Sequence, residues 1–195
     1  MNDILNINDL KNGVPGAFEK LVETHQKKVI NTCYRFLNNR EDAEEIAQEV
    51  FIEVYKAIPR FREDAKISTW IFRISVNRSL NYIKKMKRKK RFDPFRKNPG
   101  TLNEIEQVQD SPYSQPPNQL EEEERKHILQ EAMDSLPENQ KTALILRTYD
   151  GFDIKEVAEI MGMSTSAVES MVHRARKNLQ KFLFRYYKHL SSIQN

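Results

Sequence analysis

The stretch 154–183 constrains the fold of this chain more than any other part of the sequence. Apolar residues first recur at helical spacing, and Gly162 then interrupts the pattern. Beyond the glycine, apolar residues recur every three or four positions over 168–182, which predicts the buried face of a second helix. The hydroxyl of Ser164 can cap that helix, and Gly162 can adopt the positive φ of a tight turn. The stretch therefore predicts two helices joined by a tight turn.

Such a pair is a helix-turn-helix when a small residue, here Ala158, lets the second helix cross the first. The outer face of the second helix can then reach base edges and phosphates in a DNA major groove. The alternative is a helical hairpin in an ordinary bundle, with an outer face that is only solvated. The candidate DNA contacts on this face are Glu169, Ser170, His173, Arg174 and Lys177.

Charge is segregated along the chain, although the net charge is only +4. Residues 60–97 hold 14 Lys/Arg and three Asp/Glu, whereas residues 98–124 hold seven Asp/Glu and no Lys/Arg. Such segregation indicates surfaces for different partners. The basic block predicts a surface that binds a polyanion, with an affinity that falls steeply as salt concentration rises.

Several classes of protein are excluded by composition and motif content. The single cysteine, Cys33, rules out an internal disulfide, and no Cys/His cluster has the spacing of a metal site. No apolar run is long enough to span a membrane, and the N-terminus lacks a secretory signal pattern. No glycine-rich phosphate loop or nucleophile motif occurs. We therefore expect a cytoplasmic protein that is not an enzyme and uses no metal or cofactor.

Helical periodicity without strand-like alternation predicts an all-α fold. We expect two small helical domains, at 14–92 and 121–190, with the helix-turn-helix in the second. Residues 93–120 contain five prolines and little apolar content, which predicts a flexible acidic linker between the two domains. Residues before Ala17 show little pattern and are expected to be a short lead-in.

The first domain is expected to contain three helices. The first runs from Ala17 to an Asn-Asn turn at 38–39, and the second runs over 40–58 and ends at Pro59. Residues 60–68 show no helical period and are expected to form a loop. Ser68 or Thr69 can then cap the third helix, which continues into a basic run at 84–91.

The helix predicted over 40–58 pairs an apolar stripe with an acidic face. A solvated surface would explain that face, but Ile52 lies on it and indicates a contact with another molecule. The loop that follows, together with Trp70 and the basic run, is typical of proteins that bind single-stranded nucleic acid. The alternative is that Trp70 lies in the core and the basic run is a solvated helix end. We favour the core for Trp70 and nucleic-acid binding for the basic run.

Three blocks of this sequence together resemble the extracytoplasmic-function (ECF) sigma factors, the smallest members of the sigma-70 superfamily of bacterial transcription initiation factors. DAEEIAQEVFIEVYKAI is similar to conserved region 2.2, and FREDAKISTWIFRISVNRSLNYIKKMKRKKR is similar to regions 2.3 and 2.4. LPENQKTALILRTYDGFDIKEVAEIMGMSTSAVESMVHRARKNL is similar to region 4. The blocks follow the order of the family, and the resemblance covers nearly the whole chain.

The resemblance implies a factor that binds core RNA polymerase, recognises the −10 and −35 promoter elements and promotes strand opening. The first domain would be region 2, which docks on polymerase and binds the −10 element. The second would be region 4, which binds the −35 element. The implied protein partners are the β′ clamp helices and the β flap of the polymerase, and an anti-sigma factor is a candidate regulator. Residues expected to contact the clamp helices are Asp42, Glu45, Gln48, Glu49 and Ile52.

The resemblance also assigns DNA contacts to the two domains. A base of the −10 element would be flipped from the stack and held by the loop before the third helix. The −10 contacts would be Glu63, Asp64, Lys66, Ser68, Arg73, Asn77, Arg78 and Lys84. The −35 contacts would be Arg147, Ser166, Glu169, Ser170, His173, Arg174 and Lys177.

One departure from the family pattern affects the −35 face. Many members carry a basic residue, a serine and an arginine after the position of Val168, whereas this chain has Glu169, Ser170 and Met171. Two cations are therefore missing from the DNA-facing side of the helix. Glu169 could instead accept a hydrogen bond from cytosine N4, so the usual −35 preference is not expected here.

Two other functions fit parts of the sequence. A repressor or activator that binds operator DNA alone would use the helix-turn-helix but leave the acidic helix without a role. A nucleic-acid-modifying enzyme would need clustered catalytic carboxylates or a metal site. The acidic residues of this chain are instead accounted for as helix faces.

Overall fold

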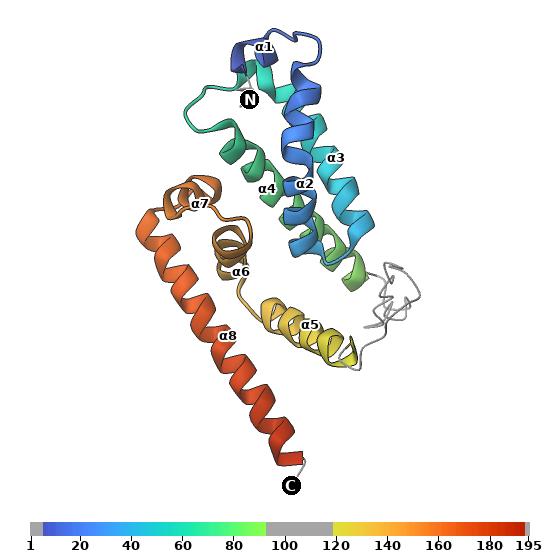
Figure 1. Ribbon diagram of the computed structural model, residues 1–195, viewed down its shortest axis with the longest axis vertical. Coiled ribbons are helices and arrows are strands. Elements are labelled where there is room, and N and C mark those ends of the chain that lie inside the picture. Colours follow the sequence, from blue (N-terminus) through green and yellow to red (C-terminus); the bar gives the residue numbers. More distant parts are fainter. Residues whose placement is uncertain (1–5, 93–118, 194–195) are drawn as a thin grey trace.

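The computed structural model describes residues 6–92 and 119–193, and within these ranges it contains helices and no strands, which confirms the all-α prediction. Figure 1 shows two helical regions, one from each range. The linker predicted at 93–120 lies almost entirely outside the described residues. The first region comprises α1 (Ile7–Lys11), α2 (Ala17–Leu37), α3 (Arg40–Ala57), the 3-10 turn η1 (Ile58–Arg60) and α4 (Ile67–Phe92).

Helices α2, α3 and α4 pack around one apolar core, to which each contributes fully buried side chains. The turn between α2 and α3 follows from two asparagines. Asn38 ends α2 in the left-handed region at φ 53°, which asparagine tolerates better than most residues. The side chain of Asn39 then accepts a hydrogen bond from the Asp42 N–H at 2.9 Å and caps α3. Both predicted helix boundaries are confirmed here.

Two predictions for the first region are wrong. The lead-in contains α1, which Asn6 caps by accepting from the Asn8 N–H at 3.0 Å and which buries Leu10. Helix α4 starts at Ile67, so Ser68 and Thr69 lie in its first turn and do not cap it. Helix α1 was missed because it has five residues and one buried side chain, which is too short a pattern for helical periodicity to be recognised.

The second region comprises α5 (Gln119–Asp134), α6 (Glu138–Leu144), the π-helical turn η2 (Ile145–Tyr149), α7 (Ile154–Met161) and α8 (Thr165–Ile193). Helices α7 and α8 form the predicted helix-turn-helix. Asp153 and Glu156 make reciprocal hydrogen bonds that cap α7, and Gly162 ends it at φ 64°. The hydroxyl of Ser164 accepts from the Ala167 N–H at 3.3 Å and so caps α8, as predicted.

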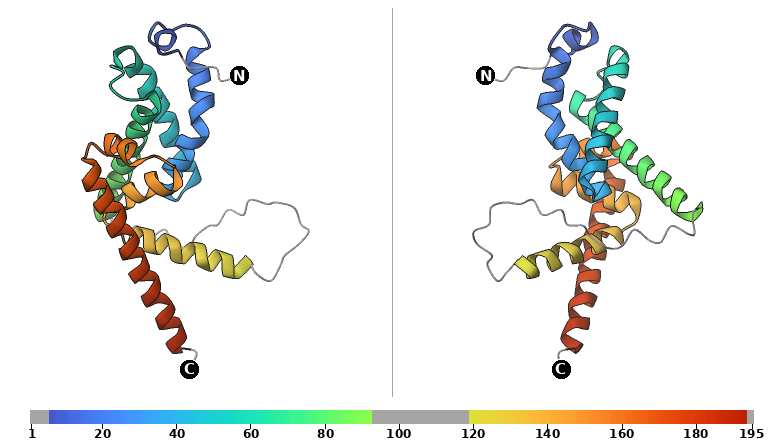
Figure 2. Two further views of the ribbon diagram at one scale, coloured as in Figure 1. Left: turned by 60° about the vertical axis from the view of Figure 1, so that its left-hand side comes forward. Right: turned by 90° about the vertical axis from the view of Figure 1, so that its right-hand side faces the viewer.

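The two regions pack against each other. Figures 1 and 2 show α6 and α7 lying beside α4 and the end of α2, while the far end of α8 extends away from the rest of the molecule. Within the described ranges, no helix is both long enough and apolar enough to cross a bilayer. Cys33 is fully buried in the core, and burial raises the pKa of its thiol to about 11, so the thiol stays protonated and shielded at neutral pH.

Candidate nucleic-acid and protein interfaces

The acidic face of α3 is exposed, as the sequence predicts. Glu45 and Gln48 are exposed, and Ile52 leaves 54% of its surface open to solvent. A large apolar side chain at that exposure, among carboxylates, is typical of a contact surface because burial by a partner would be favourable. Tyr55, 62% exposed, extends this surface by one turn of α3, and sequence analysis did not select it.

Two residues of α4 orient the carboxylates on α3. Tyr82 interacts with Asp42, and its pKa is raised to about 12, first by burial and then by the hydrogen bond and negative charge of Asp42. Arg78 donates from Nη1 to Glu49 at 3.3 Å and from Nε to Glu53 at 2.5 Å. Contacts from α4 therefore orient Asp42 and Glu49 on the acidic face of α3.

Arg78 therefore lies where the two predicted interfaces meet. The sequence assigned it to the −10 DNA, yet it also pairs with carboxylates of α3. Two hollows of about 360 and 350 Å³ are both lined by Arg78 and Glu53. Glu53 was not among the selected residues. Its spacing from Glu49, four residues along α3, was the signal that could have found it.

The loop before α4 has an unusual backbone at Glu63, which adopts φ 62°. Its carboxylate accepts from Lys11 Nζ at 2.5 Å, so α1 supports the loop that is predicted to hold a flipped base. Phe61 packs against Trp70 with ring centroids 4.9 Å apart and buries part of the indole. Asp64 is exposed, and Ser68 is half-buried at the start of α4.

Four of the residues predicted to bind −10 DNA, on α4 or directly before it, differ in their surroundings. Arg73 and Asn77 are exposed, and Asn77 lines a hollow together with Asn81, whose amide sequence analysis did not select. Lys66 and Lys84 instead form ion pairs with the second region. Lys66 Nζ lies 2.8 Å from Glu156 Oε1, and Lys84 Nζ lies 3.0 Å from Glu138 Oε1.

The predicted −35 residues lie together on the solvent side of α8. Val168, Val172 and Ala175 bury the opposite side, so the helix is fixed in rotation. Apart from Ser166, six residues were predicted to contact the −35 element, one on η2 and five on α8. All six are exposed and can form hydrogen bonds: Arg147, Glu169, Ser170, His173, Arg174 and Lys177. Ser166 is also exposed, 3.2 Å from the Ser164 hydroxyl.

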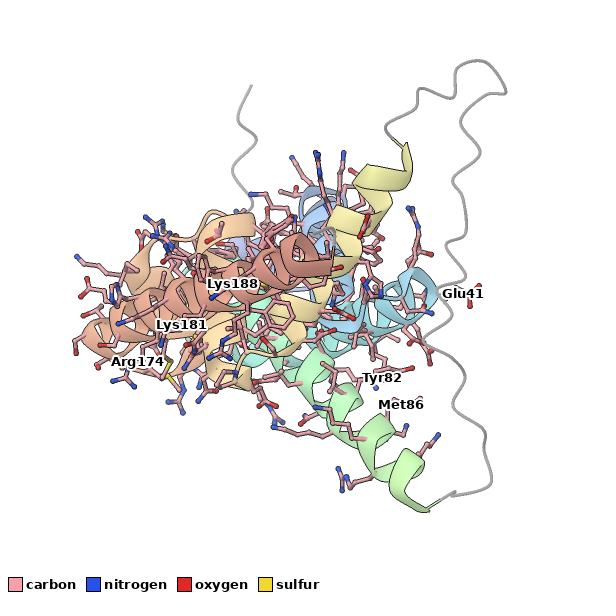
Figure 3. The ribbon with its side chains drawn as sticks, turned by 90° about the horizontal axis from the view of Figure 1, so that it is seen from below. Glu41, Tyr82, Met86, Arg174, Lys181 and Lys188 are labelled. Atoms are coloured by element: carbon pink, nitrogen blue, oxygen red, sulfur yellow. The ribbon has the colours of Figure 1, made fainter. Side chains whose placement is uncertain are left out.

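Arg147 has a structural contact as well, since its Nη1 donates to the Phe152 carbonyl at 2.9 Å. Figure 3 shows Arg174, Lys181 and Lys188 following α8, across the molecule from Glu41 at the start of α3. The basic face of α8 therefore continues beyond the predicted contacts. The described residues contain no cluster of His, Cys, Asp or Glu that could hold a metal ion.

Each of the two regions matches the model of a known protein family. Residues 21–89 match the model of Sigma-70 region 2, and residues 126–179 match that of Sigma-70, region 4. Among curated relatives, the chain is 30% identical to the ECF RNA polymerase sigma factor SigW of Bacillus subtilis, over 91% of this chain and 94% of the relative. It is 32% identical to the ECF RNA polymerase sigma-E factor of Escherichia coli K12, over 91% of this chain and 92% of the relative.

Among solved structures, the fold is similar to that of CnrH in complex with the cytosolic domain of CnrY. The TM-score is 0.67 at 21% identity, covering 93% of this chain and 96% of that chain. It is also similar to the sigma factor RpoE of Bartonella quintana, solved with the anti-sigma factor NepR. That TM-score is 0.59 at 20% identity, with 85% of this chain and 96% of that chain covered.

Proposed function

The chain belongs to the ECF group of the sigma-70 family, and from this premise we propose which of its surfaces performs each step of transcription initiation. It is a promoter-specific initiation factor that acts with core RNA polymerase. The proposed region 2 domain spans 14–92 and the proposed region 4 domain spans 121–190, with 93–120 as the connection.

The acidic face of α3 docks on the β′ clamp helices of the polymerase. Its support is the exposure of Ile52 among carboxylates, together with the anchoring of Asp42 and Glu49 from α4. A charged rim around an apolar centre favours a specific protein partner. This combination on α3 is the observation that carries the proposal, because a DNA-binding protein that acts alone has no use for it.

Helix α4 and the loop before it bind the −10 element. The loop bearing Glu63 and Asp64 would hold a flipped base, and Asn77 would contact a base edge. Arg73, Arg78 and the two lysines Lys66 and Lys84 would neutralise phosphates, which position the strand without specifying sequence. The hollow lined by Asn77 and Arg78 is adjacent to the α3 surface, so docking and −10 binding would share one edge of the molecule.

The outer face of α8 reads the −35 element in the major groove. Arg174 and Lys177 supply positive charge, Ser170 and His173 can bond to base edges or phosphates, and Glu169 can accept from cytosine N4. Region 4 is also proposed to contact the β flap. None of these steps forms or breaks a covalent bond, so we assign the factor no catalytic activity. Because it acts with RNA polymerase, we assign it to the cytoplasm.

An anti-sigma factor is a further proposed partner. The support comes from two structural neighbours, since CnrH was solved with a domain of CnrY and RpoE with the anti-sigma factor NepR. These neighbours share the fold at about a fifth identity. The identity of such a regulator for this chain is left to affinity capture from the source bacterium.

The test is run-off transcription on fragmented genomic DNA with bacterial core polymerase, with and without the protein. Start sites that depend on the protein are expected, and their upstream sequences give both promoter elements. Glu45→Lys, on the exposed α3 face, should then lower polymerase affinity and initiation about tenfold or more, since a reversed rim charge opposes its partner. Glu23→Lys, exposed on α2, makes the same charge change elsewhere and should leave both unchanged.

The competing function is a helix-turn-helix regulator that binds operator DNA alone. It predicts no protein-dependent start sites and tight, specific binding of duplex DNA by the free protein. Equal effects of Glu45→Lys and Glu23→Lys would remove the α3 assignment while leaving the initiation role intact.

A further inference from the structure

Helix α1 packs beside η1, the turn from which the loop before α4 starts (Figure 1). It precedes residues 21–89, the part of the chain that matches Sigma-70 region 2, so the family match assigns it no role. Leu10 is 4% exposed and Ile7 packs against the same core, which determines the side of α1 that faces the first region. A short helix is thus docked at the start of the loop that is proposed to hold a flipped base.

The loop itself, residues 62–65, has little backbone support. None of these residues forms a backbone–backbone hydrogen bond with another described residue. Glu63 adopts φ 62°, in the left-handed region that few residues other than glycine and asparagine occupy. Glycine would adopt this conformation without strain, so a glutamate there indicates that its side chain is used. The backbone of the loop therefore points to a function for the Glu63 carboxylate.

Lys11, at the end of α1, contacts this carboxylate from one side. Its Nζ lies 2.5 Å from Glu63 Oε1 and 6.0 Å from the centroid of the Phe61 ring. Phe61 packs against Trp70 and belongs to the buried core of the first region. The Lys11 side chain is 24% exposed, which is low for a lysine, since most lysine side chains are largely solvated. The fold therefore places the ammonium group, and the ammonium group in turn orients Glu63.

One oxygen of the Glu63 carboxylate is left for a ligand. Lys11 donates to Oε1, and Oε2 accepts no hydrogen bond from another described residue. Half of the Glu63 side chain is exposed, so a ligand can reach the carboxylate. An ionised carboxylate accepts hydrogen bonds and donates none. Cytosine, adenine and guanine carry an exocyclic amino group that can donate to it, whereas thymine carries carbonyl oxygens on both sides of its one ring N–H.

From these observations, and resting on the proposed role of this loop in −10 binding, we infer that Lys11 is a positioning residue for recognition of the flipped base. Lys11 holds Oε1 of Glu63, and Oε2 then accepts a hydrogen bond from the exocyclic amino group of the base. The loop favours a base that carries such a group and disfavours thymine. The charge of Lys11 also offsets that of Glu63, which lowers the repulsion between this carboxylate and the DNA phosphates.

The test measures base preference across the −10 element. The full-length chain is combined with core polymerase, and the template is a promoter identified by run-off transcription. Each non-template position of its −10 element is changed in turn to all four bases, together with the paired base, and the run-off product is measured. At one position, the wild type should make about tenfold less product with thymine than with a base that carries an amino group, as expected for the loss of one good base contact. Glu63→Gln should weaken this preference, because its side-chain amide can also donate to a thymine carbonyl.

Lys11→Met removes the ammonium group and keeps the apolar stem of the side chain. It should reduce the tenfold preference to about twofold, and Lys11→Arg, which can also donate to Oε1, should restore it. Lys27→Met, exposed on α2, removes the same charge elsewhere and should leave the preference unchanged. In a protein that already carries Glu63→Gln, Lys11→Met should change the preference no further, because Lys11 acts through Glu63.

Glu63→Gly separates the side chain from the backbone of the loop. Glycine relieves the strain of a positive φ but gains freedom in the unfolded chain, so the urea midpoint should stay close to that of the wild type. The preference against thymine should nevertheless be lost. A wild-type preference in Glu63→Gly would overturn the inference.

Two further results would overturn it. Lys11→Met could keep the wild-type preference, or it could lower the product equally with all four bases, which would give Lys11 a role in overall charge or in the docking of α1. The proposed function would stand in both cases, since the proteins still initiate. If the wild type initiates at no start site, the proposed function fails and the inference fails with it. Loss of the preference in Lys11→Met and its return in Lys11→Arg would support both.

Discussion

Asp150 is a carboxyl group that folding places between α2 and η2. Burial raises its pKa to about 6, while Arg35, Thr32 and Lys28 on α2 act in the opposite direction. Its Oδ2 is buried and has no hydrogen-bond partner among the described residues. A carboxyl oxygen in that setting is less costly protonated than charged. Asp150 Oδ1 accepts a hydrogen bond from Arg35 Nη1 at 2.9 Å, and it can do so while the carboxyl group is neutral.

The folded pKa exceeds the ordinary value of 3.8, so the folded state binds the proton more tightly than the unfolded chain. The free energy of unfolding should therefore fall as pH rises from about 4 to about 6, by about 3 kcal/mol. Asp150→Asn, which keeps an acceptor for Arg35 but cannot titrate, should remove this decline. Urea unfolding of both proteins at several pH values measures the difference.

Other carboxylates near this contact titrate in the opposite sense. The pKa of Asp153 is lowered first by its hydrogen bond from the Glu156 N–H, and that of Glu156 first by the hydrogen bond from Lys66. Their stabilising contribution is lost as pH falls, below the window of Asp150. Parallel pH profiles for the wild type and Asp150→Asn would contradict the role assigned to Asp150.

At the scale of single elements, α8 carries a segment proposed to enter the DNA major groove and a basic face that extends beyond it. Arg174, Lys177 and Lys181 recur at helical spacing on its exposed side. If Lys177 contacts a phosphate of the −35 element, it releases about one counterion when the complex forms. Lys177→Ala should then weaken promoter binding by the polymerase complex and reduce the slope of log affinity against log salt by about 0.9.

The measurement is a salt titration of promoter binding, using a promoter identified by run-off transcription. Lys27→Ala removes a charge from α2, away from the proposed DNA face, and should leave the slope unchanged. A change in affinity without a change in slope would mean that Lys177 supports α8 and does not neutralise a phosphate.

The elements were the most predictable part of the fold because their signals are local. The Asn38–Asn39 turn, the positive φ of Gly162 and the Ser164 cap each depend on residues a few positions apart. The exposed faces of α3 and α8 followed from helical periodicity for the same reason.

Contacts between elements were not predictable in this way. Arg35 and Asp150 are 115 residues apart, and Lys66 and Glu156 are 90 residues apart, so no periodicity links them. The pairing of Arg78 with Glu53 was also missed, because the whole polar face of α3 was assigned to solvent or to a partner. Which residues bind polymerase and DNA stays a prediction from the family resemblance.

At the scale of the whole molecule, the continuous apolar core couples the stability of the two regions. Trp70 is the single tryptophan and lies in the first region, so its fluorescence reports that region alone. Far-ultraviolet circular dichroism reports all the helices. In the wild type, the two signals should follow one unfolding transition in urea.

Phe152→Ala should separate these transitions. Loss of a buried ring against Phe72 costs about 3 kcal/mol or more, and it falls on the contact that joins the regions. The urea midpoint of the fluorescence transition should then differ from the midpoint of the circular dichroism transition. Phe184→Ala removes the same ring from a site 68% exposed on α8 and should keep the signals together. Coincident transitions in both variants would show that the regions unfold as one unit without Phe152.

The continuous apolar core shared by the two regions has a consequence for the amount of active factor in a cell. A substitution at Phe152 lowers the stability of the folded chain, although this side chain lies on no surface proposed to bind polymerase or promoter. A loss of about 1–2 kcal/mol in stability changes protein abundance several-fold. Such a substitution would change how strongly the whole set of target genes responds, while the promoter sequences being read stay the same.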